Sequence, residues 1–210
     1  MSATLYDFWR SSASYRVRIA LNLKGIPYTS VETSLPKGEQ RAPGYLNKNP
    51  QGFVPMLEID GLCLTQSLAI CDYLDAKVDA MPFVPSDPAA RSKVLAMALV
   101  IACDIHPINN LRILKYLSHP LDIPEPVRDD WYRHWVIEGF LALEAMASDC
   151  GKYLSGETPG LADICLVPQM YNARRFEVDL GPYPTLVRID AALTALPAIM
   201  AAHPDMTKPT

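Results

Sequence analysis

The change in hydrophobic pattern near residue 80 most constrains how this chain of 210 residues can fold. Strand and helix signals alternate before that point, whereas apolar residues after it recur at the spacing of three and four that is typical of helices. Three prolines lie where the pattern changes: Pro82, Pro85 and Pro88. We therefore predict an α/β domain at 1–80, a linker at 81–88 and an all-helical domain at 89–210.

Local patterns predict the elements of each domain. In the first domain we expect helices at 14–24 and 66–77, and strands at 3–9, 28–33, 55–59 and 62–65. Asp60-Gly61 favours a tight hairpin between the last two strands, and a polar loop is expected at 34–44. In the second domain we expect helices at 89–117, 125–148, 161–175 and 183–202.

Composition places the chain among globular proteins that need no metal or disulfide to fold. Half of the residues are hydrophobic, which at this length allows a sizeable core. With 19 basic and 23 acidic residues the net charge is −4, so we expect no general attraction to nucleic acid or an anionic membrane. Because we find no apolar signal segment at the N-terminus and no apolar run long enough to span a bilayer, we predict a cytoplasmic protein.

The cysteines point to the same compartment. The chain has five, widely spaced and mostly within apolar runs: Cys63, Cys71, Cys103, Cys150 and Cys165. No pair or cluster has the spacing of zinc ligands, and the four histidines are scattered. We interpret the cysteines as reduced core thiols and expect no metal site.

Serines and arginines gather around a predicted helix start between Trp9 and Ala20. Apolar residues take up helical spacing near Ser12 or Ser14. The first amide groups of a helix have no partner inside it, and the helix dipole places partial positive charge there, so an anion is stabilised at that end. The alternative is that one serine only caps the helix.

A proline interrupts the first predicted helix of the second domain. Pro107 lacks a backbone N–H, so we expect a kink or break there. His106 and Asn110 are four residues apart and are expected to share one helical face. Two interpretations remain open, a polar wall facing the first domain or a solvated polar turn at a helix end.

Several segments match a known family. They are residues 11–25 (SSASYRVRIALNLKG), Asn49-Pro50 with Val54-Pro55, Gln66 to Ile70, 103–117 (CDIHPINNLRILKYL) and 162–180. With these segments the chain resembles the zeta class of cytosolic glutathione transferases, the group that includes maleylacetoacetate isomerase and the bacterial maleylpyruvate isomerases. The serine and arginine motif and the DIHPINN segment are the most specific parts of the match.

The resemblance implies a thioredoxin-like N-terminal domain, an all-α C-terminal domain and a homodimer, with glutathione as the cofactor. Val54 would precede a cis proline and pair with the cysteinyl part of glutathione through its backbone. The helix that opens at Gln66-Ser67 would hold the γ-glutamyl carboxylate. The residues that the family would place against glutathione are Ser11, Ser12, Ala13, Gln40, Val54, Pro55, Gln66, Ser67, His106 and Asn110.

The implied chemistry moves a cis double bond in a maleyl diketo acid to the trans form by reversible addition of the glutathione thiolate. Ser12, assisted by Ser11, would keep the sulfur ionised. Arginine holds a carboxylate with two parallel hydrogen bonds, and the family positions favour Arg10 and Arg175 as substrate-binding and catalytic groups, followed by Arg112. The alternative for the Arg174-Arg175 pair is a solvated helix end or a salt bridge to Glu177 or Asp179.

Four positions depart from the family pattern. Ala13 replaces a frequent cysteine, Tyr15 a frequent tryptophan, and Gly52 a polar residue near the glycine end of glutathione. Gly160 replaces the serine or threonine of a capping box that Asp163 would complete. Two other functions therefore stay open, a glutathione transferase acting on small electrophiles or halo acids, and a binding protein that has lost catalysis.

Overall fold

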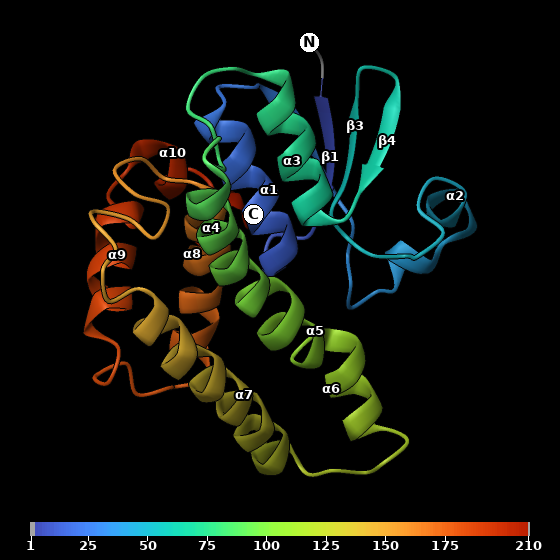
Figure 1. Cartoon of the computed structure of the whole chain (residues 1–210). Helices are drawn as coiled ribbons and strands as arrows, with labels where there is room; N and C mark the ends of the chain where they lie inside the picture. Colours follow the sequence, from blue (N-terminus) through green and yellow to red (C-terminus); the bar gives the residue numbers. More distant parts are fainter. Residues whose placement is uncertain (1–2, 210) are drawn as a thin grey trace. The chain divides into compact units, whose positions relative to one another are not determined.

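The computed structural model describes residues 3–209 and divides into two compact units (Figure 1). The first unit runs to Phe83 and also includes the chain from Thr194 onward, and the second is Val84–Leu193. The sequence grouped 194–210 with the helical domain. In the structure this segment packs on α1 (Ser12–Leu23), where Arg18 Nε donates to the carbonyl of Ala202 at 3.0 Å.

A four-stranded sheet forms the core of the first unit, with strand order β2-β1-β3-β4. The strands are β1 (Ala3–Asp7), β2 (Tyr28–Glu32), β3 (Met56–Ile59) and β4 (Leu62–Thr65). β1 pairs with β2 in parallel and with β3 antiparallel, and β3 pairs antiparallel with β4. The predicted hairpin turn is present, with positive φ angles at Asp60 and Gly61 that suit such a turn.

Helices α1 and α3 (Ser67–Lys77) pack side by side against the sheet (Figure 1). Val17, Leu21 and Ile70 on their inner faces are fully buried. This α/β arrangement is the predicted thioredoxin-like class. The expected polar loop is wrong in part, because it contains η1 (Glu39–Arg41) and leads into α2 (Pro43–Leu46). Both are single turns, too short to produce a periodic pattern.

Seven consecutive helical segments build the second unit, as expected for its all-helical class. They are α4 (Pro88–Leu99), the π-helical η2 (Val100–Ile105), α5 (His106–Ile108), α6 (Leu111–Ser118), α7 (Glu125–Met146), α8 (Leu161–Arg175) and α9 (Pro184–Thr194), whose last residue belongs to the first unit. The helix predicted at 183–202 is wrong in its extent, because α9 ends before Pro197 begins α10 (Pro197–Met200). A further turn, α11 (Pro204–Thr207), was not predicted.

The stretch Pro88–Ser118 is long and apolar enough to cross a membrane by length and composition, which the sequence analysis did not detect. It is not one regular helix, because it passes through η2 and breaks at Asn109 and Asn110. It also packs within the unit against α7 and α8. About a third of its apolar window is buried, and one stretch of this kind is weak evidence for a membrane span, because core helices of soluble proteins pass the same test.

Asp163 holds the start of α8 from inside the second unit. Its carboxylate is fully buried and accepts hydrogen bonds from the amides of Leu154 at 2.8 Å, Ser155 at 3.1 Å and Gly160 at 3.0 Å. Burial raises the pKa of this carboxyl, and the amide donors oppose that shift. Because Gly160 has no side chain, only the Asp163 half of a capping box exists here.

The cysteines differ from their prediction as core thiols. Within residues 3–209 none of the five is in a disulfide, but only Cys71 and Cys165 are buried, while Cys63 and Cys103 are exposed. Cys63 lies in β4 and Cys103 in η2. Both segments are apolar in sequence, but these two positions face outward.

Candidate functional site

The turn from β1 to α1 is fixed by a buried ion pair. Arg18 Nη1 donates to both carboxylate oxygens of Asp7 at 2.8 Å, and Nη2 donates to the carbonyl of Trp9 at 2.9 Å. Asp7 is the last residue of β1, so the pair joins the end of the strand to the second turn of the helix. The segment between them therefore has one defined path.

Ser11 and Ser12 lie at the start of α1, as predicted. Ser11 is the N-cap, and its Oγ accepts a hydrogen bond from the amide of Ser14 at 3.3 Å. The capping interpretation is thus correct for Ser11, whose own hydroxyl hydrogen can still be donated. Ser12 is 9% exposed and Ala13 half-buried in the first turn, where amides have no partner inside the helix.

A short loop leads into β3 and is held by two side chains. The Tyr45 hydroxyl donates to the carbonyl of Phe53 at 2.5 Å, and Asn49 Nδ2 donates to the same oxygen at 2.8 Å. Burial raises the pKa of Tyr45 to about 12, so its hydroxyl keeps its proton at neutral pH. The Val54-Pro55 bond that follows is cis, as predicted, and Val54 is buried.

Gly52 is required by the shape of this loop. Its φ is +63°, and a Cβ there would lie 2.9 Å from Arg41 Nη1 and 3.0 Å from the carbonyl oxygen of Gln40. The end of the Arg41 side chain could move aside, but a Cβ would still press on the Gln40 carbonyl, and the positive φ strains any side chain at this position. Gln40 itself lies in η1 and is half-buried, so the loop brings it beside Gly52.

The start of α3 carries the next two predicted residues. Gln66 has φ 66° and ψ 116°, a backbone conformation that residues other than glycine rarely adopt and that recurs at functional sites. Its side-chain Nε2 donates to Gln51 Oε1 at 2.5 Å, which ties α3 to the loop before β3. Ser67 is buried, and Gln66 makes no side-chain cap to the helix.

The second unit holds the remaining predicted residues. His106 is half-buried in α5, while Asn110 is the N-cap of α6 and its Oδ1 accepts from the Arg112 amide at 3.1 Å. The expected common face of His106 and Asn110 is wrong, because the helix breaks at Asn109, which has φ −102° and ψ 6°. Pro107 lies two residues before this break, as the sequence suggested. The Arg112 side chain is exposed.

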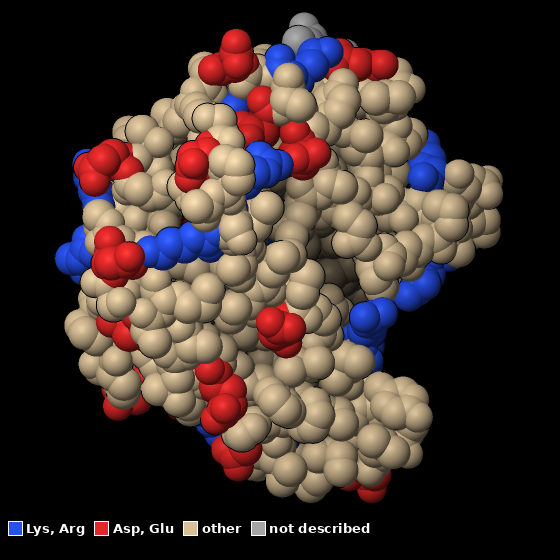
Figure 2. Space-filling view, viewed as in Figure 1, with Lys and Arg blue, Asp and Glu red and all other residues tan. Residues whose placement is uncertain are grey.

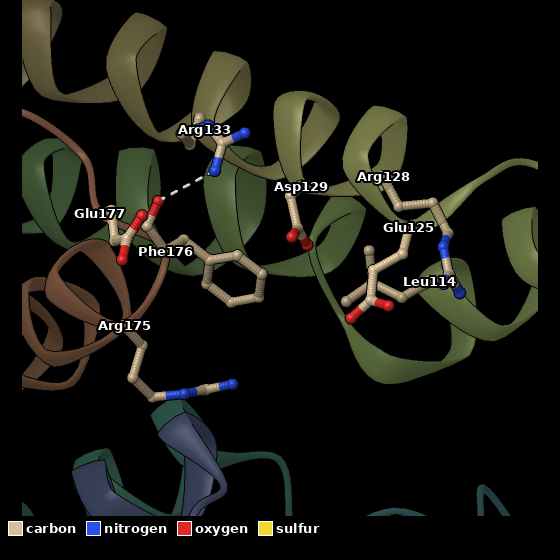
Figure 3. Close-up of a pocket in the computed structure, with 8 residues that line it drawn as sticks. All are labelled: Leu114, Glu125, Arg128, Asp129, Arg133, Arg175, Phe176 and Glu177. Atoms are coloured by element: carbon tan, nitrogen blue, oxygen red, sulfur yellow. Dashed lines mark hydrogen bonds between the residues drawn. The ribbon is translucent and has the colours of Figure 1, made fainter.

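Arg175 lines a cavity of about 440 Å³ in the second unit (Figure 3). The other lining residues come from α6, α7 and the end of α8: Leu114, Glu125, Arg128, Asp129, Arg133, Phe176 and Glu177. In Figure 3 the Arg175 side chain extends past the Phe176 ring, and the Asp129 carboxylate points into the space. Arg175 Nη1 donates to Asn172 Oδ1 at 3.1 Å.

The two neighbouring arginines at the end of α8 differ in role. Arg174 forms a salt bridge of 2.6 Å with Asp190, a buried carboxylate, so it is structural. The alternative partners considered from the sequence, Glu177 and Asp179, are not its ion-pair partners. Arg175 instead reaches the cavity. Arg10, in the first unit, is exposed, with its guanidinium 5.4 Å from the centre of the Trp9 ring.

Charge is distributed without one dominant sign. On the face shown in Figure 2, basic and acidic side chains are interspersed, and the surface over α6 is mostly uncharged. Among residues 3–209, no group of three or more His, Cys, Asp or Glu side chains could hold a metal ion. Because charges of both signs alternate on the face shown in Figure 2, we expect an anion to bind there through local groups such as the helix starts and arginines described above.

One residue of the site was missed by the sequence analysis. Arg16 is buried in α1, and its Nη1 donates to Ser67 Oγ at 3.3 Å, which links the starts of α1 and α3. Residues two apart in a helix point to nearly opposite sides, so Arg16 and Arg18, in an otherwise apolar segment, could not both face solvent. This spacing was the signal in the sequence that at least one of the two arginines is buried.

Comparison with known proteins identifies the family. Residues 1–76 match the glutathione S-transferase N-terminal domain. A protein of Vibrio cholerae named probable maleylacetoacetate isomerase is 50% identical, over 98% of this chain and 97% of that protein. The holo structure of a maleyl pyruvate isomerase, described as a bacterial zeta-class glutathione transferase, is 42% identical with a TM-score of 0.96 over 99% of both chains.

A second solved structure is that of maleylacetoacetate isomerase from Methylobacterium extorquens AM1 with bound malonate and glutathione. It is 39% identical, with a TM-score of 0.94, and the match covers 99% of this chain and 100% of that one. The similarity spans both units and both sets of candidate residues. The chain therefore belongs to the maleylacetoacetate and maleylpyruvate isomerase family of zeta-class glutathione transferases.

Proposed function

We propose that this chain catalyses the glutathione-dependent cis–trans isomerisation of a maleyl diketo acid, maleylacetoacetate or maleylpyruvate. The observation that carries the proposal is the pair of helix starts in the first unit. Each places a buried serine, Ser12 or Ser67, beside amides that have no partner inside the helix. The names of the relatives support the same reaction.

The residues of the first unit fit glutathione as a bound anion. α3 has no side-chain cap, so its first amides and the Ser67 hydroxyl can bind the γ-glutamyl carboxylate. The backbone of Val54, held by the cis bond to Pro55, would pair with the cysteinyl residue. When bound, glutathione supplies the thiolate that adds to the cis alkene and leaves again after rotation.

The start of α1 provides the group that would keep this sulfur ionised. Ser12 lies in the first turn, where its hydroxyl and the helix dipole both favour a negative charge. We assign Ser12 as the main hydrogen-bond donor to the sulfur. Ser11 assists, although its Oγ also caps the helix. A hydroxyl that stabilises thiolate over thiol lowers the thiol pKa.

Arginines would bind the acidic substrate and stabilise the negative charge that develops on its carbonyl oxygen. Arg175 is our first candidate because it reaches a cavity in the second unit and is positioned by Asn172. Arg10 and Arg112 are both exposed and complete the proposed set. The relative crystallised with malonate shows that a member of this family binds a small dicarboxylate.

The reaction can be tested by substrate comparison. Purified protein is given maleylacetoacetate, maleylpyruvate or an aryl halide, each with and without glutathione. We expect rapid isomerisation of at least one diketo acid that requires glutathione and leaves its concentration unchanged. Consumption of glutathione in step with product would instead identify a conjugating transferase. Absence of turnover combined with binding would support the non-catalytic alternative.

Ser12→Ala should lower kcat/KM about 10- to 100-fold, the cost of losing one hydrogen bond to a charged group, about 1.5–3 kcal/mol. The pKa of the bound thiol, followed by ultraviolet absorbance of the thiolate, should rise in the same variant. Ser11→Ala is the comparison and should mainly lower stability, by about 1 kcal/mol for a lost cap. An unchanged thiol pKa in Ser12→Ala would remove Ser12 from this role.

Arg175→Met should raise KM for the diketo acid about 10- to 100-fold while leaving glutathione affinity unchanged, because a charge-assisted contact with a carboxylate is lost. The adjacent Arg174→Met is the control. It removes the ion pair of the buried Asp190 carboxylate and should lower the thermal midpoint without raising KM. Equal KM in the two variants would contradict the assignment.

We also propose that the chain is a cytoplasmic homodimer. α7 leaves a stripe of large apolar side chains exposed: Val127, Trp131, Ile137 and Leu141. Helical spacing gathers them on one side, and an apolar stripe of this kind is suited to association with a second copy. The cysteines among residues 3–209, none of them in a disulfide, are compatible with a reducing compartment.

Light scattering of the purified protein should give twice the chain mass. Leu141→Arg should shift it to the mass of one chain, because a charge would be buried in the apolar contact. Leu121→Arg replaces an equally exposed leucine outside the stripe and should leave the dimer intact. A monomeric wild-type protein at assay concentration would refute the dimer.

A further inference from the structure

Two arginines are buried in α1, at positions 16 and 18, and their surroundings differ. Every nitrogen of the Arg18 guanidinium has an acceptor: the Asp7 carboxylate for Nη1, the Trp9 carbonyl for Nη2 and the Ala202 carbonyl for Nε. Its charge is neutralised inside the protein by Asp7. Arg18 therefore has all its hydrogen bonds and its counterion within the protein, and its role is structural.

Arg16 is also buried, with 2% of its surface exposed, but most of the hydrogen-bonding capacity of its guanidinium is unused. Within residues 3–209 its hydrogen bond is the one from Nη1 to Ser67 Oγ at 3.3 Å, and Nε and Nη2 have no partner. No carboxylate of the described chain forms an ion pair with it. The ligand-free protein thus carries a buried positive charge without a counterion.

Such a charge is costly, because burial removes its hydration and the single hydrogen bond to Ser67 replaces only part of it. A more stable fold would place an apolar side chain here, as at the neighbouring buried position Val17. A bound anion would act as the missing counterion and would explain why an arginine is retained here. Ser67, the hydrogen-bond partner of Arg16 among residues 3–209, lies at the start of α3, where the helix dipole also favours negative charge.

We propose that Arg16 is a positioning residue for the γ-glutamyl α-carboxylate of glutathione. Because Ser67 Oγ accepts from Arg16, its hydroxyl hydrogen is left to be donated outward to the carboxylate. The guanidinium also places a full positive charge behind that hydroxyl. The anion thus balances the buried cation through Ser67, and this inference rests on the proposed use of glutathione.

The test compares two peptides by calorimetry. One is glutathione, and the other is γ-aminobutyryl-cysteinyl-glycine, which lacks only the α-carboxylate of the γ-glutamyl residue. Arg16→Met should weaken glutathione binding about 10- to 100-fold, as for loss of a charge-assisted interaction, and change binding of the second peptide less than about threefold. The difference between the two peptides reports the coupling of Arg16 to the carboxylate.

Two further variants refine the result. Arg16→Lys keeps the charge without the planar guanidinium and should retain part of the glutathione affinity. Ser67→Ala should also weaken glutathione binding, and adding Arg16→Met to it should cost less than Arg16→Met alone, because the hydroxyl through which Arg16 acts is already absent.

Stability separates this role from a structural one. Without ligand, Arg16→Met should have a thermal midpoint equal to or above that of the wild type, since it removes an uncompensated buried charge. Arg18→Met is the matched control and should lower the midpoint by about 10 °C, because Asp7 would be left buried and unpaired.

Three outcomes would overturn the inference. The first is equal weakening of both peptides by Arg16→Met, and the second is a fall in its ligand-free midpoint as large as that of Arg18→Met. In either case wild-type binding and turnover remain, so the proposed function survives. The third is failure of the wild-type protein to bind glutathione at millimolar concentration, which would overturn the proposed function as well.

Discussion

The ion pair between Asp7 and Arg18 determines where α1 begins, and the candidate site of the first unit depends on that position. The pair joins the last residue of β1 to the helix, and the same guanidinium holds the Trp9 carbonyl in the intervening turn. Ser11 and Ser12 follow directly. Because the backbone of this turn is fixed from inside the core, the serines at the helix start need little rearrangement to receive an anion.

The two units use positive charge in different ways. In the first unit the charge comes from helix ends and from the buried Arg16, all set on elements packed against the sheet. In the second unit Arg175 is exposed at the end of α8 beside a cavity. Rigidly held positive groups are suited to a cofactor that binds in the same way in every turnover. An exposed arginine side chain can move, which is suited to a substrate whose geometry changes during the reaction.

Elements with a repeated pattern over several residues were predictable from the sequence, and helices of a single turn were not. The strands and long helices follow from repeated apolar spacing and the turn at Asp60-Gly61 from a local motif, while the cis bond before Pro55 was implied by the family resemblance. α2 and α11 last one turn each, so no period develops. The break at Asn109 separates His106 from Asn110 although their spacing is helical. The different partners of Arg174 and Arg175 depend on Asp190, which is distant in sequence.

The family departures are explained by their surroundings rather than by loss of the site. Gly52 takes a positive φ in a loop where a Cβ would press on the Gln40 carbonyl, so the loop favours glycine there. Gly160 gives up the hydroxyl of a capping box, yet Asp163 binds three amides and holds the start of α8. Ala13 adds no polar group to the first turn of α1. The hydroxyls and arginines on which the proposed chemistry depends are therefore all retained around these changes, which argues for an active enzyme over a scaffold.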